Sequence, residues 1–140
     1  MDFYTARRIL FEYINEFYLL EKGAVIFEPD KPFIFNNVIL RRRAIKHVIE
    51  QRKAERISPN EMKRLFTRIL KTIDRFDMEI ININQSDYPM SIMQTKIFPE
   101  SEIGIVVVLD KHNDVGHRTF ITAFYCRPER IVLMQKKKPQ

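Results

Sequence analysis

Apolar residues recur with a helical period in the first half of the chain and alternate with polar residues in the second half. The first periodic stretch begins at Asp2, a residue type that caps helices, and ends at Lys22 and Gly23. It predicts a helix with a broad aromatic surface over residues 3–20. We expect this surface to be covered by the domain itself or by a partner.

Two short β-rich runs follow, residues 24–27 and 33–35, with a proline-containing turn between them. They predict a small hairpin or a structured crossing. The next periodic stretch predicts a second helix that begins after Asn36 or Asn37 and ends near Ala54.

The third helix has a sharp start signal. Ser58 and Glu61 form a capping box with Pro59 at the first helical position, and Ile57 with Met62 fits a hydrophobic staple. Its predicted core side consists of Met62, Leu65, Phe66, Ile69, Leu70 and Ile73.

After residue 77 the pattern changes to β-rich runs divided by short polar turns, which favour antiparallel neighbours. These runs are 78–83, 90–98, 103–109 and 118–126, and a further short strand is predicted over 130–134. Helices first and sheet second predict an α+β fold, with N-terminal helices packed on one face of an antiparallel β-sheet of about four strands.

With 140 residues, of which 45% are hydrophobic, the chain has the size of one domain over residues 1–140. We divide it into a possible docking element (1–37), an α+β core (38–134) and a basic tail (135–140). The lone Cys126 cannot form an intramolecular disulfide, and neither a secretory signal nor a membrane-spanning run is present. These features predict a soluble, cytoplasmic protein in which Cys126 is a small core residue.

The net charge of +6 is concentrated in one part of the chain. Residues 41–75 hold twelve Lys or Arg against four Asp or Glu. A concentrated positive surface attracts a polyanion, because neutralising several phosphates releases their counterions. A solvated helical surface or an acidic protein partner explains the same charge.

A helical wheel at about 100° per residue sorts the bases of the second helix. Its buried face contains Leu40, Ala44, Ile45, Val48 and Ile49. Arg42, Lys46 and Lys53 fall opposite that face, whereas Arg41 and Arg52 fall inside the apolar arc and His47 borders it. An unpaired guanidinium inside the arc would be costly, so Arg41, Arg52 and His47 are expected to point towards the sheet.

Several kinds of chemistry receive little support. The three glycines are too dispersed for a phosphate-binding loop, and no Cys/His spacing fits zinc. His112 and His117, with Asp110 and Asp114 nearby, can in principle bind a metal, but solvated histidines in a polar loop are the commoner case. We therefore predict no metal and no cofactor.

A basic surface with histidine and hydroxyl groups suits RNA cleavage without a metal. That reaction needs a base for the 2′-hydroxyl proton, cations for the charged phosphorane and an acid for the departing oxygen. His47 and Arg52 supply the first two, and Thr119 or Thr122 supplies a hydroxyl. Strand alternation puts Thr122 with Phe120 and Phe124 on one face, and Thr119 with His117, Ile121 and Ala123 on the other.

Two stretches carry a family resemblance: RAIKHVIEQR at residues 43–52 and TFITAFY at 119–125. With the helix and strands between them, they resemble the phage-associated branch of the barnase, EndoU, colicin and RelE-like ribonuclease superfamily. The resemblance covers roughly residues 38–126. It implies a helix bearing a His-hydrophobic pair and a nearby Arg, followed by a four-stranded antiparallel sheet.

The resemblance also implies roles. His47 matches the helix histidine that acts as general acid or base, Arg52 the phosphate-binding arginine, and Thr122 the threonine at the scissile phosphate. Lys53 stands where the family often has a second histidine, and the proline common after the aromatic residue is absent, so His117 or Lys96 is the alternative for the second proton transfer.

These observations lead to three hypotheses. The first is a metal-independent endoribonuclease of toxin or effector type, with RNA as its substrate and an antitoxin, an immunity protein or a second copy bound through residues 3–20. The second is a protein that binds nucleic acid without cutting it, and the third is an assembly component. The candidate RNA contacts are Arg41, Arg42, Lys46, Lys53, Lys96, His117 and Thr119.

Overall fold

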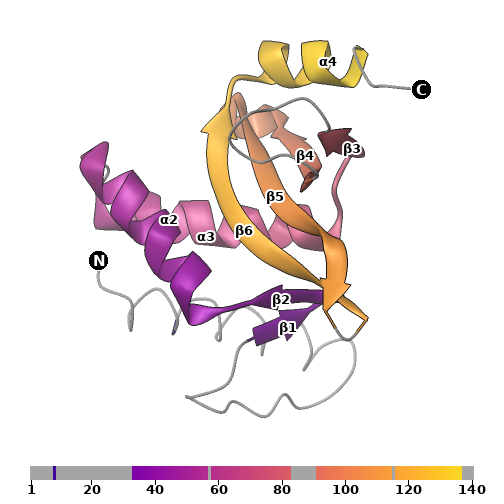
Figure 1. Cartoon of the computed structure of the whole chain (residues 1–140). Helices are drawn as coiled ribbons and strands as arrows, with labels where there is room; N and C mark the ends of the chain where they lie inside the picture. The colour runs from indigo at the N-terminus through magenta and orange to yellow at the C-terminus, as the bar shows by residue number, and fades with distance from the viewer. Residues whose placement is uncertain (1–7, 9–32, 57, 83–90, 115, 137–140) are drawn as a thin grey trace, which may run out of the picture.

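The computed structural model describes residues 8, 33–56, 58–82, 91–114 and 116–136. These residues form a six-stranded sheet with helices on both faces (Figure 1). The elements are β1 (Phe33–Phe35), β2 (Val38–Leu40), α2 (Arg42–Ala54), α3 (Pro59–Asp74), β3 (Met78–Asn82), β4 (Ser91–Phe98), a 3-10 turn (Pro99–Ser101), β5 (Ile103–Asp114), β6 (His117–Cys126) and α4 (Pro128–Lys136). The predicted α+β class is confirmed.

Four of the strands form the antiparallel meander that the sequence predicts. β3 pairs with β4, β4 with β5 and β5 with β6, each in antiparallel register. Their β-branched and apolar residues alternate between two cores, as a sheet covered on both faces requires. Glu102 has a left-handed backbone conformation (φ 54°) and ends the 3-10 turn before β5. Gly116 (φ 82°) lies in the turn between β5 and β6.

The sheet is larger than predicted because of a hairpin at its edge. Asn36 (φ 49°) and Asn37 (φ 63°) both adopt left-handed backbone and join β1 to β2. β2 then pairs in parallel with β6, so the sheet is mixed and runs β1-β2-β6-β5-β4-β3. The prediction of about four antiparallel strands is therefore wrong.

The same turn corrects the start of the second helix. Asparagine caps helices but also tolerates the left-handed conformation of a two-residue hairpin turn, and here it adopts the turn. α2 consequently begins at Arg42, and Leu40 is a buried strand residue rather than a helical one. The predicted run at 24–27 and the aromatic surface of 3–20, apart from Arg8, lie outside the described residues.

α3 begins where the capping box predicts. The Ser58 hydroxyl accepts the backbone N–H of Glu61 at 3.2 Å, and Pro59 opens the helix. The expected core side is buried without exception: Met62, Leu65, Phe66, Ile69, Leu70 and Ile73. Together with Ile45, Val48 and Ile49 of α2, these residues pack on one face of the sheet.

The predicted strand at 130–134 is wrong, because this segment belongs to α4. Pro128 at the start and Glu129 in the first turn are helix-start signals that outweigh the β-branched pair that follows them. The buried Ile131 packs against Met93 and Val106 on the face opposite α2 and α3. Helices therefore cover both faces of the sheet rather than one (Figure 1).

A β-bulge interrupts β6 near its middle. The pairing with β5 skips Ile121, between Phe120 and Thr122. As a result Phe120 and Ala123 both reach the core under α2 and α3, although simple alternation predicted opposite faces. The prediction of two fixed side-chain sets on this strand is wrong for that reason.

Candidate functional site

One contact seats α2 on β6. The Thr122 hydroxyl donates to Gln51 Oε1 over 3.4 Å, and Thr122 is only 1% exposed. α2 reaches this position because it follows β2 directly and β2 is paired with the beginning of β6. The structure therefore brings two of the predicted motifs together, and we call the Gln51–Thr122 contact, with His47 and Arg52 nearby on α2, the α2–β6 junction.

Arg52 lies partly buried at this junction. Its side chain is 12% exposed, and Nη1 forms an ion pair with Glu55 Oε1 at 3.3 Å. Its Nε is shielded from solvent and has no acceptor among the described residues. The predicted inward position of Arg52 is confirmed, and part of its hydrogen-bonding capacity is unused.

His47 lies on the solvent side of α2 instead of pointing towards the sheet. It precedes Gln51 by one helical turn and so shares its side of the helix. Arg52, five residues after His47, is rotated by about 140° from it. His47 therefore neighbours the Gln51–Thr122 contact, whereas Arg52 approaches from another side of α2.

The remaining predicted contacts are dispersed. Arg41, in the link between β2 and α2, is exposed rather than buried, and Lys46 is exposed as predicted. His117 and Thr119 are partly buried at the beginning of β6, and His117 Nδ1 has no hydrogen-bond partner among the described residues. Arg42 and Lys53 belong to α2, but their side chains lie outside the described part of the structure.

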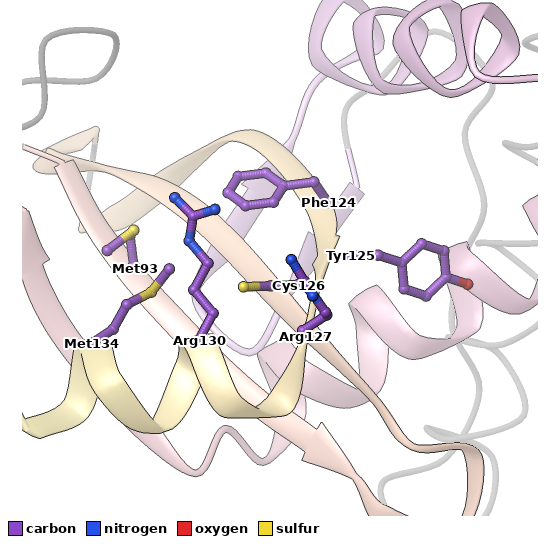
Figure 2. A pocket seen from close by; sticks show the side chains of 7 residues that line it. All are labelled: Met93, Phe124, Tyr125, Cys126, Arg127, Arg130 and Met134. Atoms are coloured by element: carbon purple, nitrogen blue, oxygen red, sulfur yellow. The ribbon is translucent and has the colours of Figure 1, made fainter.

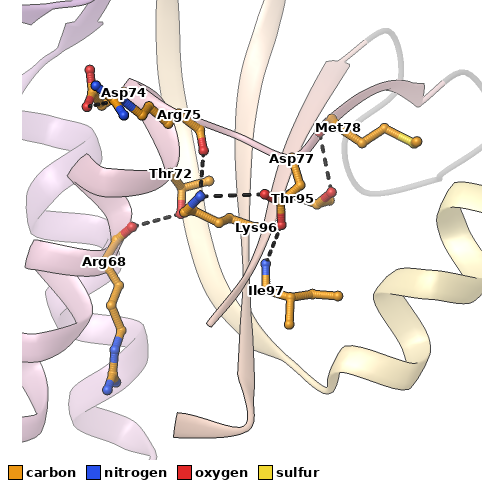
Figure 3. A network of polar contacts seen from close by, with 9 residues as sticks. All are labelled: Arg68, Thr72, Asp74, Arg75, Asp77, Met78, Thr95, Lys96 and Ile97. Atoms are coloured by element: carbon orange, nitrogen blue, oxygen red, sulfur yellow. Dashed lines mark hydrogen bonds and ion pairs between the residues drawn. The ribbon is translucent and has the colours of Figure 1, made fainter. Parts of the chain in front are cut away.

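Lys96 is engaged far from the junction. Its Nζ donates to the carbonyl oxygen of Arg75 at 2.8 Å and lies 3.5 Å from Asp77 Oδ1 (Figure 3). The other carboxylate oxygen of Asp77 accepts the backbone N–H of Ile97 at 2.9 Å. Lys96 thus ties the end of α3 to β4, where a cation interacts favourably with the negative end of the helix dipole. Its contacts do not involve the residues of the α2–β6 junction.

α2, α3 and their links present positive charge to solvent. The exposed bases of this region are Arg41, Arg43, Lys46, Arg56, Lys63, Arg64, Lys71 and Arg75. Among these bases, Arg64 pairs with Glu61, and Arg75 lies 3.8 Å from Asp74. Surface pairs of this kind are weak and screened by salt, so the surface remains available to a polyanion.

Sequence reasoning missed a polar cavity of about 320 Å³ beyond the C-terminal end of α3. Asn36 forms one wall and is fixed there, because its Nδ2 donates to the carbonyl oxygens of Ile73 at 2.9 Å and Asp74 at 3.4 Å. The full lining consists of Asn36, Asn37, Val38, Phe76, Glu79, Gln94, Gly116 and Arg118. We call it the α3-end cavity. In the sequence, it is indicated only by polar residues at strand positions that the pattern predicts to be covered.

A second cavity, also of about 320 Å³, lies on the opposite face beside α4. Figure 2 shows the Cys126 sulfur between the side chains of Arg127 and Arg130, while Tyr125 points away from them. Burial raises the pKa of the Cys126 thiol above its ordinary value, although the two arginines act in the opposite direction. The thiol therefore stays protonated at neutral pH, which agrees with its predicted role as a packing residue.

Among residues 33–56, 58–82, 91–114 and 116–136, no group of three His, Cys, Asp or Glu is arranged to hold a metal ion. Within the same part of the chain, none of the helices is both long enough and apolar enough to cross a membrane. Comparison of the chain with protein-family models, with curated proteins and with solved structures finds no match.

Proposed function

We propose that this protein is a metal-independent endoribonuclease that binds RNA on the basic surface of α2 and α3 and cleaves it at the α2–β6 junction. The observation that carries the proposal is the contact between Gln51 and Thr122. It joins the helix that bears His47 and Arg52 to the strand that bears the threonine. The succession of two helices and four antiparallel strands is also the one that the ribonuclease resemblance implies.

The reaction is an attack of the 2′-hydroxyl on the adjacent phosphorus. His47 takes the hydroxyl proton, the O2′–P bond forms, the P–O5′ bond breaks and the departing 5′ oxygen takes a proton from solvent. The products are a 2′,3′-cyclic phosphate and a 5′-hydroxyl end. His47 is suited to the base role because it is solvent-exposed and an imidazole nitrogen can accept a hydroxyl proton.

Arg52 and Gln51 stabilise the charge that develops on the phosphorane. Arg52 Nε is shielded from solvent and Nη1 is paired with Glu55, so Nη2 is the nitrogen that would face the phosphate. Gln51 accepts from Thr122 through Oε1, which leaves its amide N–H groups to face a phosphate oxygen. Thr122, being 1% exposed, acts as a positioning residue that orients Gln51.

The test combines cleavage with binding. The full chain is incubated with a structured RNA such as tRNA in EDTA, and RNA affinity is measured at two salt concentrations. We expect cleavage products with cyclic phosphate ends and an affinity that falls steeply with salt. Charge reversal of the exposed Arg43 and Lys46 weakens binding and flattens the salt dependence, while the exposed Leu133→Ala on α4 changes neither.

A second candidate is RNA binding without cleavage. Two observations favour it: the Thr122 hydroxyl is buried, and Arg52 is already paired with Glu55. It predicts the same salt-sensitive binding but no product in EDTA, and no effect of His47→Ala beyond the loss of one basic group. The assay for RNA cleavage products in EDTA therefore distinguishes the two candidates.

A further inference from the structure

Two of the residues that line the α3-end cavity form an ion pair. Arg118 Nη1, from β6, contacts Glu79 Oε1, from β3, although β5 and β4 lie between these strands in the sheet. Both side chains are partly exposed. Because the two charges offset each other, the cavity does not select a simple ion, but it keeps a donor and an acceptor beside each other.

Gln94 of β4 lines the cavity beside this bridge and pairs with Glu79 across the strands. It is 4% exposed, and its Oε1 has no hydrogen-bond partner among the described residues. Buried amide oxygens are normally hydrogen-bonded, and each exception calls for an explanation. A ligand that donates to this oxygen supplies the missing partner.

The rim of the cavity has an aromatic residue. Phe76, in the link between α3 and β3, is 38% exposed, although large apolar side chains usually pack inside. An exposed ring beside polar groups provides a stacking surface for a flat ligand. The cavity volume of about 320 Å³ is that of a small-molecule site rather than of a groove for a helix or strand.

We propose that the α3-end cavity binds a single unstacked nucleobase that has an exocyclic amino group. The amino group donates to Gln94 and Glu79, a ring nitrogen or carbonyl accepts from Arg118, and the ring stacks on Phe76. Adenine, cytosine and guanine each offer two such hydrogens, whereas uracil offers a single N–H. The site accordingly favours these three bases over uracil.

This inference rests on the proposed function, in that it gives the RNA substrate a base preference. Arg118 and Thr122 lie on the same strand, four residues apart, which corresponds to about 13 Å of extended chain. One RNA strand is long enough to place a base in the cavity and a phosphate at the α2–β6 junction. The base contact and the cleavage chemistry use different residues and are tested separately.

The experiment is a titration of the ¹⁵N-labelled full chain with cytidine and with uridine, nucleosides that lack a phosphate and differ in the group proposed to be read. We expect cytidine at millimolar concentration to shift the side-chain amide signals of Gln94, and uridine to bind at least about fivefold more weakly. Equal binding of the two nucleosides, or no shift with either, overturns the proposal.

Two variants show whether the named residues make the contact. Gln94→Met keeps an apolar stem of similar length and removes the amide, and Phe76→Ala removes the ring at an exposed site. Each should weaken cytidine binding about fivefold or more, while Leu133→Ala, which also shortens an exposed apolar residue, leaves it unchanged. If Gln94→Met lowers the melting temperature, Phe76→Ala decides, and unchanged cytidine binding in Phe76→Ala contradicts the site.

The outcome is independent of cleavage. Cytidine binding with no RNA product in EDTA leaves this site standing and removes the proposed ribonuclease activity. His47-dependent cleavage of RNA, together with equal binding of cytidine and uridine, supports the ribonuclease activity and removes this site.

Discussion

Gln51 and Thr122 are 71 residues apart in the sequence, yet their side chains share a hydrogen bond of 3.4 Å between α2 and β6. Thr122 is buried, so this contact holds a polar group of the helix against the interior of the sheet. It fixes how the exposed His47, one turn earlier on α2, lies relative to the strand.

Replacing Thr122 by Val tests this contact. The substitution keeps the shape of the side chain and removes the donor to Gln51 Oε1. We expect the free energy of unfolding to fall by about 1 kcal/mol, measured by urea denaturation. Thr119→Val is the matched control, because the Thr119 hydroxyl has no partner among the described residues; an equal loss in both variants would argue against the contact.

If Arg52 binds phosphate as proposed, its ion pair with Glu55 competes with RNA. Glu55→Ala removes the carboxylate 3.3 Å from Arg52 Nη1 and frees the guanidinium for RNA. Glu50→Ala removes the same charge from an exposed position of α2. We expect Glu55→Ala to raise RNA affinity about threefold more than Glu50→Ala, measured by fluorescence anisotropy; identical effects of the two variants would mean that Arg52 does not contact RNA.

Gly104 has no room for a side chain. A Cβ added there would lie 2.7 Å from the Cys126 carbonyl oxygen and closer still to Ile131 Cδ1 of α4. Gly104→Ala should therefore destabilise the fold by about 1–3 kcal/mol, measured by thermal unfolding. Shortening Ile131 to Val in the same chain relieves one of the two clashes and should restore part of the loss; wild-type stability of Gly104→Ala would contradict the packing of α4.

The raised pKa of Cys126 makes a pH prediction. Because the folded thiol loses its proton at higher pH than the unfolded one, its contribution to stability is full at neutral pH and is lost as pH rises through the folded pKa. Wild type should lose more stability than Cys126→Ala between about pH 7 and about pH 10, measured by urea midpoints. Parallel pH profiles would place the thiol in solvent.

Local signals predicted the elements that depend on local chemistry. The Ser58 capping box begins α3, and the apolar period around Ile45 and Val48 defines the buried side of α2. The four-strand meander follows from its short turns. Where a signal had two meanings, tertiary context decided: Asn36 formed a turn rather than a cap.

Long-range contacts decided the rest, and no local pattern contains them. The parallel pairing of β2 with β6 and the bulge at Ile121 depend on how the sheet closes. The Glu79–Arg118 bridge joins residues 39 positions apart. In the candidate site, sequence reasoning named Arg52 and Thr122, but it missed Gln51, which Thr122 contacts, and placed His47 too far inward.

The most direct test of the ribonuclease proposal is the rate at which cyclic phosphate ends form on tRNA in EDTA, with wild type and His47→Ala compared at saturating protein. The proposal predicts cyclic ends with wild type and a rate at least about 100-fold lower in His47→Ala, with RNA affinity reduced no more than in Lys46→Ala. Equal rates in wild type and His47→Ala, or RNA binding without any cyclic ends, would contradict it.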